Sequence, residues 1–177
     1  MTENKKASWL NDPCERLAIP PDMHEMMFRD IDKQGLAELG DQEGIVNLSP
    51  TVFPSVAFPA DGVIYSESNR LMVCLPCRHV RKPAATVNVW FIVDTGSNWT
   101  FLAKETIEAL ICKDDPFPRR LRVAIGDPNS EIECNVSPPE PEGHFEDANV
   151  LGMLALRYLK LSVVADWKKD RFKLIKQ

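Results

Sequence analysis

The segment Phe91-Ile92-Val93-Asp94-Thr95-Gly96-Ser97 joins a short apolar run to an acidic turn that contains glycine. Three consecutive apolar residues suit a strand that is covered on both faces. Gly96 permits a tight turn and leaves room for a ligand or a second backbone to approach. The hydroxyls of Thr95 and Ser97 can orient a carboxylate without adding bulk. This order predicts that Asp94 stands at the buried end of a strand, among small hydrogen-bonding groups.

A second apolar segment ending in glycine follows about 58 positions after Asp94. Asn149-Val150-Leu151-Gly152-Met153 predicts a strand that stops at the glycine. Residues 154–159 then suit a short helix, and a terminal hairpin is predicted to turn at residues 168–170.

Together the two segments resemble the retropepsins, the retroviral-type aspartic proteases. That family carries an apolar pair before Asp-Thr-Gly-Ser or Asp-Thr-Gly-Ala, and an apolar-apolar-Gly segment and a helix follow. A plain β-turn with Asp at its first position is the alternative for the tetrapeptide alone, and the second segment argues against it. The resemblance covers about residues 70–177. It implies an all-β fold, a retropepsin-like acid protease half-barrel with one short C-terminal helix.

The resemblance also implies a role for each residue of the site. Asp94 would be the catalytic carboxylate, Thr95 would grip the partner subunit beneath the aspartates, and Gly96 would accept the substrate backbone. Substrate-binding roles are implied for Ser97, Asn98, Trp99, Gly126, Val150 and Leu151. In this set Ser97 would brace the carboxylate, Trp99 would narrow a side-chain pocket, and the two apolar residues of the second segment would form walls.

A single Asp-Thr-Gly per chain bears directly on mechanism. Peptide hydrolysis of this kind needs two carboxylates that share a proton, one acting on a water and the other polarising the scissile carbonyl. No other Asp of the sequence has a comparable setting, and no internal repeat supplies one. We therefore expect a symmetric homodimer with Asp94 and its symmetry mate in one site. A heterodimer with a related chain is the alternative.

The flap that should close over the substrate has two candidate positions. The alternating runs 119–125 and 131–136 flank Gly126-Asp127-Pro128-Asn129-Ser130, a strong hairpin signal that places Gly126 at the flap tip. The same hairpin could be a pair of core strands, which would leave the flap in the loop from Lys113 to Pro118. Either flap lacks the several glycines usual in the family, and a stiff flap would weaken closure over substrate.

Composition excludes several other classes of function. The net charge is −5 and the isoelectric point is near 5.3, so there is no electrostatic reason to expect a nucleic-acid partner. No apolar run is long enough to span a membrane, and the polar first residues do not read as a signal peptide.

The five cysteines are Cys14, Cys74, Cys77, Cys112 and Cys134. An odd number without a secretory signal favours free thiols in a reducing compartment, so we expect a cytoplasmic protein. Cys74 and Cys77 form a C-x-x-C, but on a strand residues three apart face opposite sides. We therefore expect two ordinary thiols, no metal and no cofactor.

The chain divides into residues 1–62, an N-terminal extension, and residues 63–177, the retropepsin-like domain. Within the extension, residues 21–33 are predicted to form a helix, because prolines and an acid open it and Met23, Met26, Met27 and Ile31 share one face. A Pro-rich connector follows. The residues from Pro138 to Asp147 are polar and Pro-rich, which predicts a surface loop.

The sequence therefore predicts an aspartic endopeptidase that acts as a homodimer on an extended peptide or protein substrate. The alternative is a retropepsin-fold dimerisation or peptide-binding module with little or no catalysis, which the poor flap signature and the added N-terminal residues favour.

Overall fold

The computed structural model describes residues 28, 30–81, 84–138 and 145–177. The helices and strands in these residues are α1 (Lys33–Glu43), β1 (Pro50–Thr51), β2 (Ala60–Tyr65), β3 (Arg70–His79), β4 (Thr86–Val93), β5 (Phe101–Leu102), α2 (Lys104–Leu110), β6 (Arg120–Ile125), β7 (Glu131–Val136), β8 (Asn149–Leu151), α3 (Met153–Leu159), β9 (Leu161–Asp166) and β10 (Arg171–Lys176).

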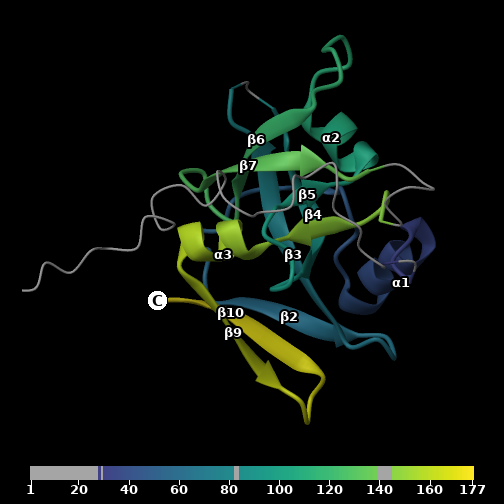
Figure 1. The fold of residues 1–177 in the computed structure, drawn as a ribbon, viewed down its shortest axis with the longest axis vertical. Coiled ribbons are helices and arrows are strands. Elements are labelled where there is room, and N and C mark those ends of the chain that lie inside the picture. The colour runs from purple at the N-terminus through teal and green to yellow at the C-terminus, as the bar shows by residue number, and fades with distance from the viewer. Residues whose placement is uncertain (1–27, 29, 82–83, 139–144) are drawn as a thin grey trace, which may run out of the picture.

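Six of these strands close into a barrel in the order β3–β4–β8–β5–β7–β6, with β6 returning to β3 (Figure 1). The long strand β3 closes the barrel, because it pairs with β4 and its residues 77–79 also pair with β6. Residues 70–73 of β3 pair with β2, which lies outside the barrel. Beyond β2 the sheet continues through β10 to the terminal strand β9. The predicted all-β class is confirmed.

Strand β4 is buried on both faces, as its unbroken apolar run predicts. Alternate residues of a strand face opposite sides, so Phe91 and Val93 point one way and Ile92 points the other. The inner core fills the barrel and includes Val73, Leu75, Val89, Phe91, Val93, Ile125 and Leu151. The outer core lies on the opposite face of β3 and β4 and comprises Phe28, Ile31, Leu36, Leu39, Met72, Trp90, Ile92, Phe101, Phe145, Ala148 and Val150.

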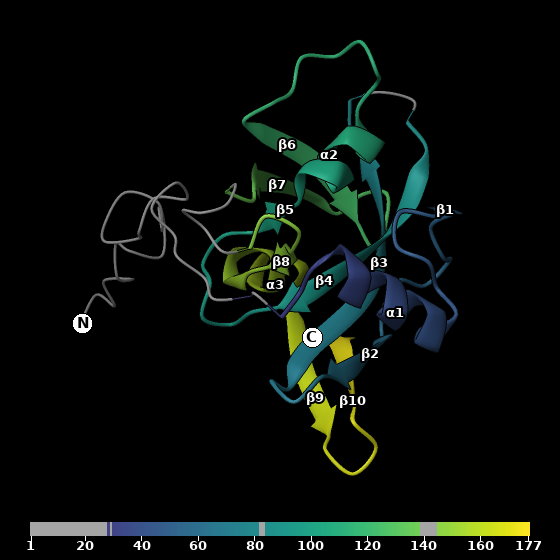
Figure 2. The same ribbon diagram turned by 90° about the vertical axis from the view of Figure 1, so that its right-hand side faces the viewer.

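The N-terminal part of the described chain covers the outer face of the barrel. Figure 2 shows α1 in front of β3 and β4, and Leu36 and Leu39 carry its buried side into the outer core. The following residues run along the free edge of β4, where the Trp90 indole N–H donates to the Ile45 carbonyl at 2.9 Å and the Leu48 N–H donates to the Asn88 carbonyl at 2.7 Å. The boundary predicted at residue 62 falls inside β2.

The predicted helix over residues 21–33 differs from the structure where the two can be compared. Residues 21–27 and 29 lie outside the described residues, and with them the methionine stripe. Phe28 and residues 30–32 are not helical. Helix α1 begins instead at Lys33, because the Asp32 side chain caps it by accepting from the Gly35 N–H at 2.8 Å.

Helix α1 also contains two glycines, Gly35 and Gly40, although glycine has a low helix propensity. Gly40 is needed there because a Cβ at this position would lie 2.9 Å from the Ile45 carbonyl oxygen. Close packing of the returning chain therefore overrides the low helix propensity of glycine. The helix ends at Gly44, which adopts a left-handed conformation with φ 68°.

Most of the elements predicted from local patterns are confirmed. These are the strand that leads into Asp94, the strand that ends before Gly152, the hairpin of β6 and β7, the helix α3, and the terminal hairpin. The polar loop predicted from Pro138 to Asp147 is corrected at Phe145, which is 1% exposed and packs edge-on against Phe101 and Phe28 with ring centroids 5.2 and 6.4 Å apart. Residues 139–144 lie outside the described residues.

Candidate functional site

Asp94 immediately follows β4 and is held there by its own backbone. Its N–H donates to the Leu151 carbonyl at 3.1 Å, which extends the parallel pairing of β4 with β8 by one residue. Its Oδ1 atom accepts a hydrogen bond from the Gly96 N–H at 2.8 Å. Asp94 is half-buried, while Thr95 and Gly96 are exposed. Hydrogen bonds from the backbone therefore hold Asp94 in place, while the residues that follow it in the turn are open to solvent.

The N-terminal end of α3 fastens the Asp94 turn, by which we mean residues 94–99. The Met153 N–H donates to the Ser97 carbonyl at 2.8 Å, and the Leu154 N–H donates to the Asn98 carbonyl at 3.0 Å. The Asp94 turn and the end of β8 cross closely at Gly152, where a Cβ would lie 2.1 Å from the Trp99 carbonyl oxygen. Only glycine allows this approach.

A buried amide ties three strands together behind the turn. Asn149 is 1% exposed; its amide nitrogen donates to the Trp90 carbonyl at 3.2 Å, and its Oδ1 atom accepts from the Ala103 N–H at 2.9 Å. Thr100 adds a further tie, accepting from the Gly152 N–H at 3.3 Å. Sequence reasoning gave neither residue a role. For Asn149, the signal in the sequence was a polar residue at the start of the otherwise apolar strand β8.

The remaining residues of the Asp94 turn, Ser97 to Trp99, contact the turn backbone and the outer core. Ser97 is 2% exposed, and its hydroxyl donates to the Trp99 carbonyl at 3.0 Å. The bond therefore braces the turn backbone, whereas the resemblance implied that Ser97 braces the Asp94 carboxylate. Asn98 and Trp99 are half-buried, and Trp99 packs against the outer core.

Val150 and Leu151 do not line an open cleft in this chain. Both are 0% exposed. Leu151 points into the inner core and Val150 into the outer core, where the N-terminal segment covers it. The implied role of apolar walls is corrected to core packing, because residues outside the resemblance occupy the face on which Val150 stands.

The hairpin with Gly126 at its tip belongs to the barrel wall. Strand β6 pairs with β3 and β7, so the alternative of a core β-pair is the arrangement observed. The Gly126 N–H donates to the Pro76 carbonyl at 2.9 Å, and a Cβ at Gly126 would lie 3.1 Å from the Phe58 ring. Gly126 is thus placed against Phe58 and Pro76, and its substrate-binding role as a flap tip is corrected.

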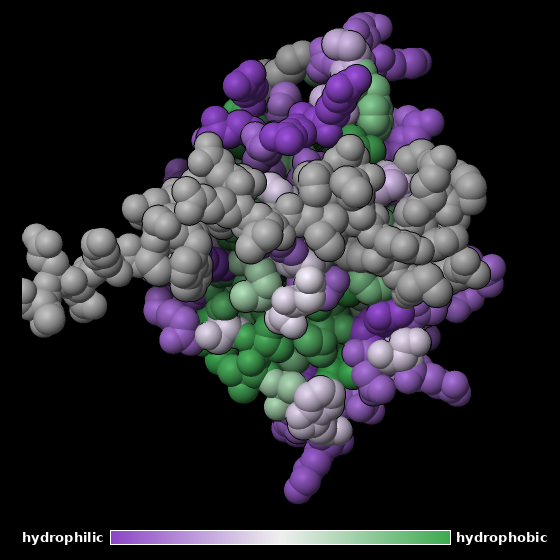
Figure 3. All heavy atoms as spheres, in the orientation of Figure 1, coloured by the Kyte–Doolittle hydropathy of each residue, from purple (hydrophilic) through white to green (hydrophobic). Residues whose placement is uncertain are grey.

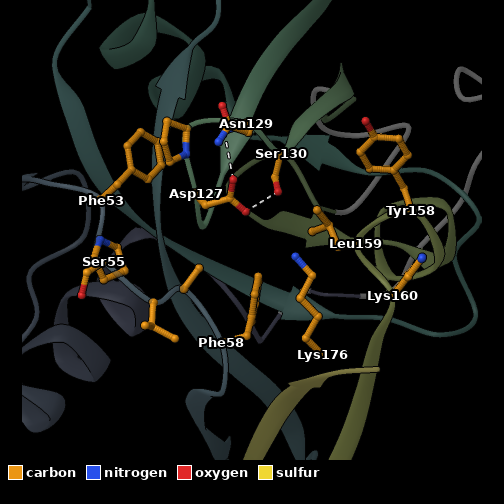
Figure 4. A pocket seen from close by; sticks show the side chains of 14 residues that line it. Phe53, Ser55, Phe58, Asp127, Asn129, Ser130, Tyr158, Leu159, Lys160 and Lys176 are labelled. Atoms are coloured by element: carbon orange, nitrogen blue, oxygen red, sulfur yellow. Dashed lines mark hydrogen bonds between the residues drawn. The ribbon is translucent and has the colours of Figure 1, made fainter.

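The tip of this hairpin lines a cleft of about 880 Å³ near the C-terminal end of α3 (Figure 4). Tyr158 and Lys160 line the same cleft, whereas the Asp94 turn is bound to the opposite end of the helix. The Asp127 carboxylate accepts hydrogen bonds from the Asn129 N–H at 2.9 Å and from the Ser130 hydroxyl. These bonds stabilise the turn itself.

The other flap candidate, Lys113 to Pro118, lies in the loop between α2 and β6, which projects at the top of Figure 1. The Cys112 N–H donates to the Asp115 carboxylate at 3.1 Å, and the Asp115 N–H donates back to the Cys112 carbonyl at 2.9 Å. Phe117 is 46% exposed.

Arg70 is a charged residue of the site that sequence reasoning missed. Met72 pairs with Ile92 across β3 and β4, so two residues further along this antiparallel pairing Arg70 stands opposite Asp94. Hydrogen bonding to Asp30 raises the pKa of Arg70, partial burial opposes the rise, and the Asp94 carboxylate adds to it. The pairing register of β3 and β4 is the feature from which the position of Arg70 opposite Asp94 could have been predicted.

The described cysteines are free thiols, as predicted. Cys77 is fully buried in the inner core, while Cys74 packs against the outer core, so the C-x-x-C residues face opposite sides of β3. Within the described residues no group of three or more His, Cys, Asp or Glu side chains could hold a metal ion. No helix in the same part of the chain is long and apolar enough to cross a membrane.

Alkylation should separate these thiols by burial. Burial raises the pKa of Cys74 to about 12 and raises the pKa of Cys77 and Cys134 strongly, so at pH 8 all three remain protonated. Cys112 is exposed. Iodoacetamide at pH 8, followed by peptide mapping, should label Cys112 first and leave Cys77 and Cys134 unlabelled until denaturant is added. Equal labelling of all four sites would contradict this burial pattern.

Comparisons with known proteins give a likeness in structure. No protein-family model matches the sequence, and no curated protein matches it. Among solved structures, the chain is similar to a retropepsin-like aspartic protease from Rickettsia conorii, with 24% sequence identity, a TM-score of 0.39, and coverage of 64% of this chain and 88% of that chain.

Proposed function

We propose that this protein is an aspartic endopeptidase that acts as a homodimer. One observation carries the proposal: the Asp94 carboxylate stands at the end of β4, fixed by the backbone of β8 and by the Gly96 N–H, with Thr95 and Gly96 exposed beside it. This is the setting that the sequence resemblance to retropepsins implies for a catalytic aspartate.

The chemistry follows from pairing two such carboxylates. Two acids a few ångströms apart cannot both ionise cheaply, so they hold one proton between them and titrate as a unit. The ionised member takes a proton from a water molecule that attacks the scissile carbonyl, while the protonated member donates a hydrogen bond to the carbonyl oxygen. A single chain supplies one Asp-Thr-Gly, so the second carboxylate comes from a second copy.

Apolar surface beside the Asp94 turn supports this pairing. Helix α3 begins at the residues that bind the turn, and Figure 3 shows hydrophobic surface gathered over the region of α3, β9 and β10. Met153 is 41% exposed and Val164 is 51% exposed, and Leu154, Val163 and Ala165 are half-buried. Burying such surface favours association with a second copy.

The replacement Asp94→Asn tests the proposal. It keeps the size of the side chain and removes the ionisable group, so we expect cleavage of a diverse peptide library to fall by at least about 10³-fold at mildly acidic and neutral pH, with unfolding unchanged. The matched control is Asp41→Asn, an exposed acid of helix α1, which should cleave like the wild type. Cleavage that persists in a clean Asp94→Asn preparation would rule out the assignment.

A binding module with little catalysis is the second candidate. It is favoured by the position of the Gly126 hairpin in the barrel wall and by the outer core, which covers the face of β4 that precedes Asp94. The same library assay separates the two candidates, because sustained turnover by the wild type that is lost in Asp94→Asn is incompatible with a binding-only protein.

A further inference from the structure

The side chain of Asp94 projects from the face of the barrel that the N-terminal segment covers. Trp90 and Ile92 both point into the outer core, and Asp94 follows two residues later on the same side of the chain. On the neighbouring strand β8, Val150 occupies the outer core just before the Gly152 crossing. The apolar surface next to the carboxylate is therefore the outer core.

Four residues of the N-terminal segment fill that surface: Phe28, Ile31, Leu36 and Leu39. Phe28 is 7% exposed and Ile31 is 4% exposed. The Phe28 ring lies under the Arg70 guanidinium, whose carbon is 4.8 Å from the ring centroid. The Phe28 ring also packs edge-on with the Phe145 ring. An aromatic side chain thus packs against Arg70, the residue that stands opposite Asp94.

A charged pair secures the same segment. Arg70 donates two hydrogen bonds to Asp30, from Nε at 2.8 Å and from an Nη atom at 2.7 Å, which is the bidentate geometry that binds a carboxylate most firmly. These hydrogen bonds lower the pKa of Asp30 against a smaller opposing effect of burial, so the pair stays ionised into the acidic range. Arg70 consequently binds one carboxylate, that of Asp30, and has a second, that of Asp94, nearby.

A turn-type hydrogen bond links Phe28 to Ile31. The Ile31 N–H donates to the Phe28 carbonyl at 3.0 Å, which is the hydrogen bond of a turn and not of an extended strand. Peptides that bind along a sheet do so in the extended form. The segment can therefore occupy side-chain pockets beside Asp94 while its own peptide bonds are poorly presented for cleavage.

We propose that Phe28 and Asp30–Asp32, here called the strap, hold the Asp94 site in a self-inhibited state by occupying the pockets that a substrate needs. Displacing the strap exposes an apolar pocket and the Arg70 guanidinium, which together suit a peptide with an aromatic side chain and a nearby carboxylate. This inference rests on the proposed function, since it names the substrate class and the regulation of the same site.

Two strap variants of the full-length protein test it. Phe28→Ala empties the aromatic pocket, and Asp30→Asn breaks the charged pair while the apolar contacts remain, so the second variant serves if the first fails to fold. Glu43→Gln is the matched control, because Glu43 in the same N-terminal region also pairs with a strand arginine, Arg171, at 2.5 Å. Thermal unfolding by circular dichroism checks that each protein is folded.

Two measurements are made on each protein. The first is kcat/KM on the peptide library. The second is binding of a fluorescein-labelled Ala-Phe-Ala-Asp-Ala peptide in the Asp94→Asn background, where it cannot be cleaved, with Ala-Phe-Ala-Asn-Ala as the reference peptide. We expect the strap variants to bind the acidic peptide about tenfold more tightly than the parent and to show kcat/KM raised by a similar factor, because the competent state is no longer a minor one.

The outcomes distinguish the two proposals. Tighter binding without turnover in any protein supports the strap and refutes the protease. Turnover with equal kcat/KM and equal peptide binding in the parent, the control and the strap variants supports the protease and refutes the strap. Folded strap variants that neither bind nor cleave refute both.

Discussion

Replacing Gly152 with alanine is expected to destabilise the folded protein strongly. The added Cβ would lie 2.1 Å from the Trp99 carbonyl oxygen and 2.6 Å from its carbonyl carbon. Both are backbone atoms. The backbone at Trp99 cannot move away, because the N–H groups of Met153 and Leu154 bind the carbonyls of Ser97 and Asn98 just before it. We expect a loss of about 3 kcal/mol or more, a large share of the roughly 5–15 kcal/mol typical of a domain.

Urea unfolding followed by tryptophan fluorescence measures this loss. Gly44→Ala is the matched control, because Gly44 has a left-handed φ of 68° but open space around its Cβ position. It should cost about 1 kcal/mol, the ordinary price of a side chain in that conformation. Equal midpoints for the two variants would show that the crossing at Gly152 is looser than the geometry requires.

The part of the fold that the sequence predicts well is governed by local patterns. The apolar run before Asp94 and the segment that ends in Gly152 identified both members of the crossing, because each signal lies within a few residues. The turn glycine and asparagine likewise predicted the β6–β7 hairpin. Local chemistry cannot say where a hairpin tip lies in the barrel, so the same signal misplaced Gly126 as a flap.

The parts that were missed depend on contacts between distant residues. Helix α1 carries glycines that propensity reads as breaks, yet Gly40 is required by the close approach of Ile45. Phe145 stands in a polar, Pro-rich stretch, and only its packing on Phe101 makes it a core residue. Arg70 acquires its place beside Asp94 from strand register, which a single hydrophobic pattern does not fix.

The outer core explains why Val150 was predicted to be a cleft wall although it is a core residue. A resemblance over residues 70–177 describes a barrel with an open face, and Val150 would stand on it. In this chain the added residues before β2 close that face with Phe28, Ile31 and α1. The difference is therefore a property of the N-terminal segment, and it is the reason why the strap inference could arise only from the structure.

Mixing wild-type protein with Asp94→Asn should suppress wild-type activity. If each active site contains one Asp94 from each of two copies, a mixed dimer has a single functional carboxylate and cannot share a proton across the pair. With equal amounts and free exchange of subunits, about half of the wild-type activity should remain, and a tenfold excess of the variant should leave about a tenth. A chain that works alone would lose nothing.

The measurement is the initial rate of peptide cleavage at fixed wild-type concentration while the variant is titrated. Asp41→Asn chains serve as the control, because Asp41 is exposed on helix α1 and these chains should add activity in proportion to their amount. A rate that is unaffected by any excess of Asp94→Asn, under conditions where native mass spectrometry detects mixed dimers, would mean that one carboxylate is sufficient. The proton-sharing mechanism would then be wrong for this protein, because the second acid would have no part in activating the water.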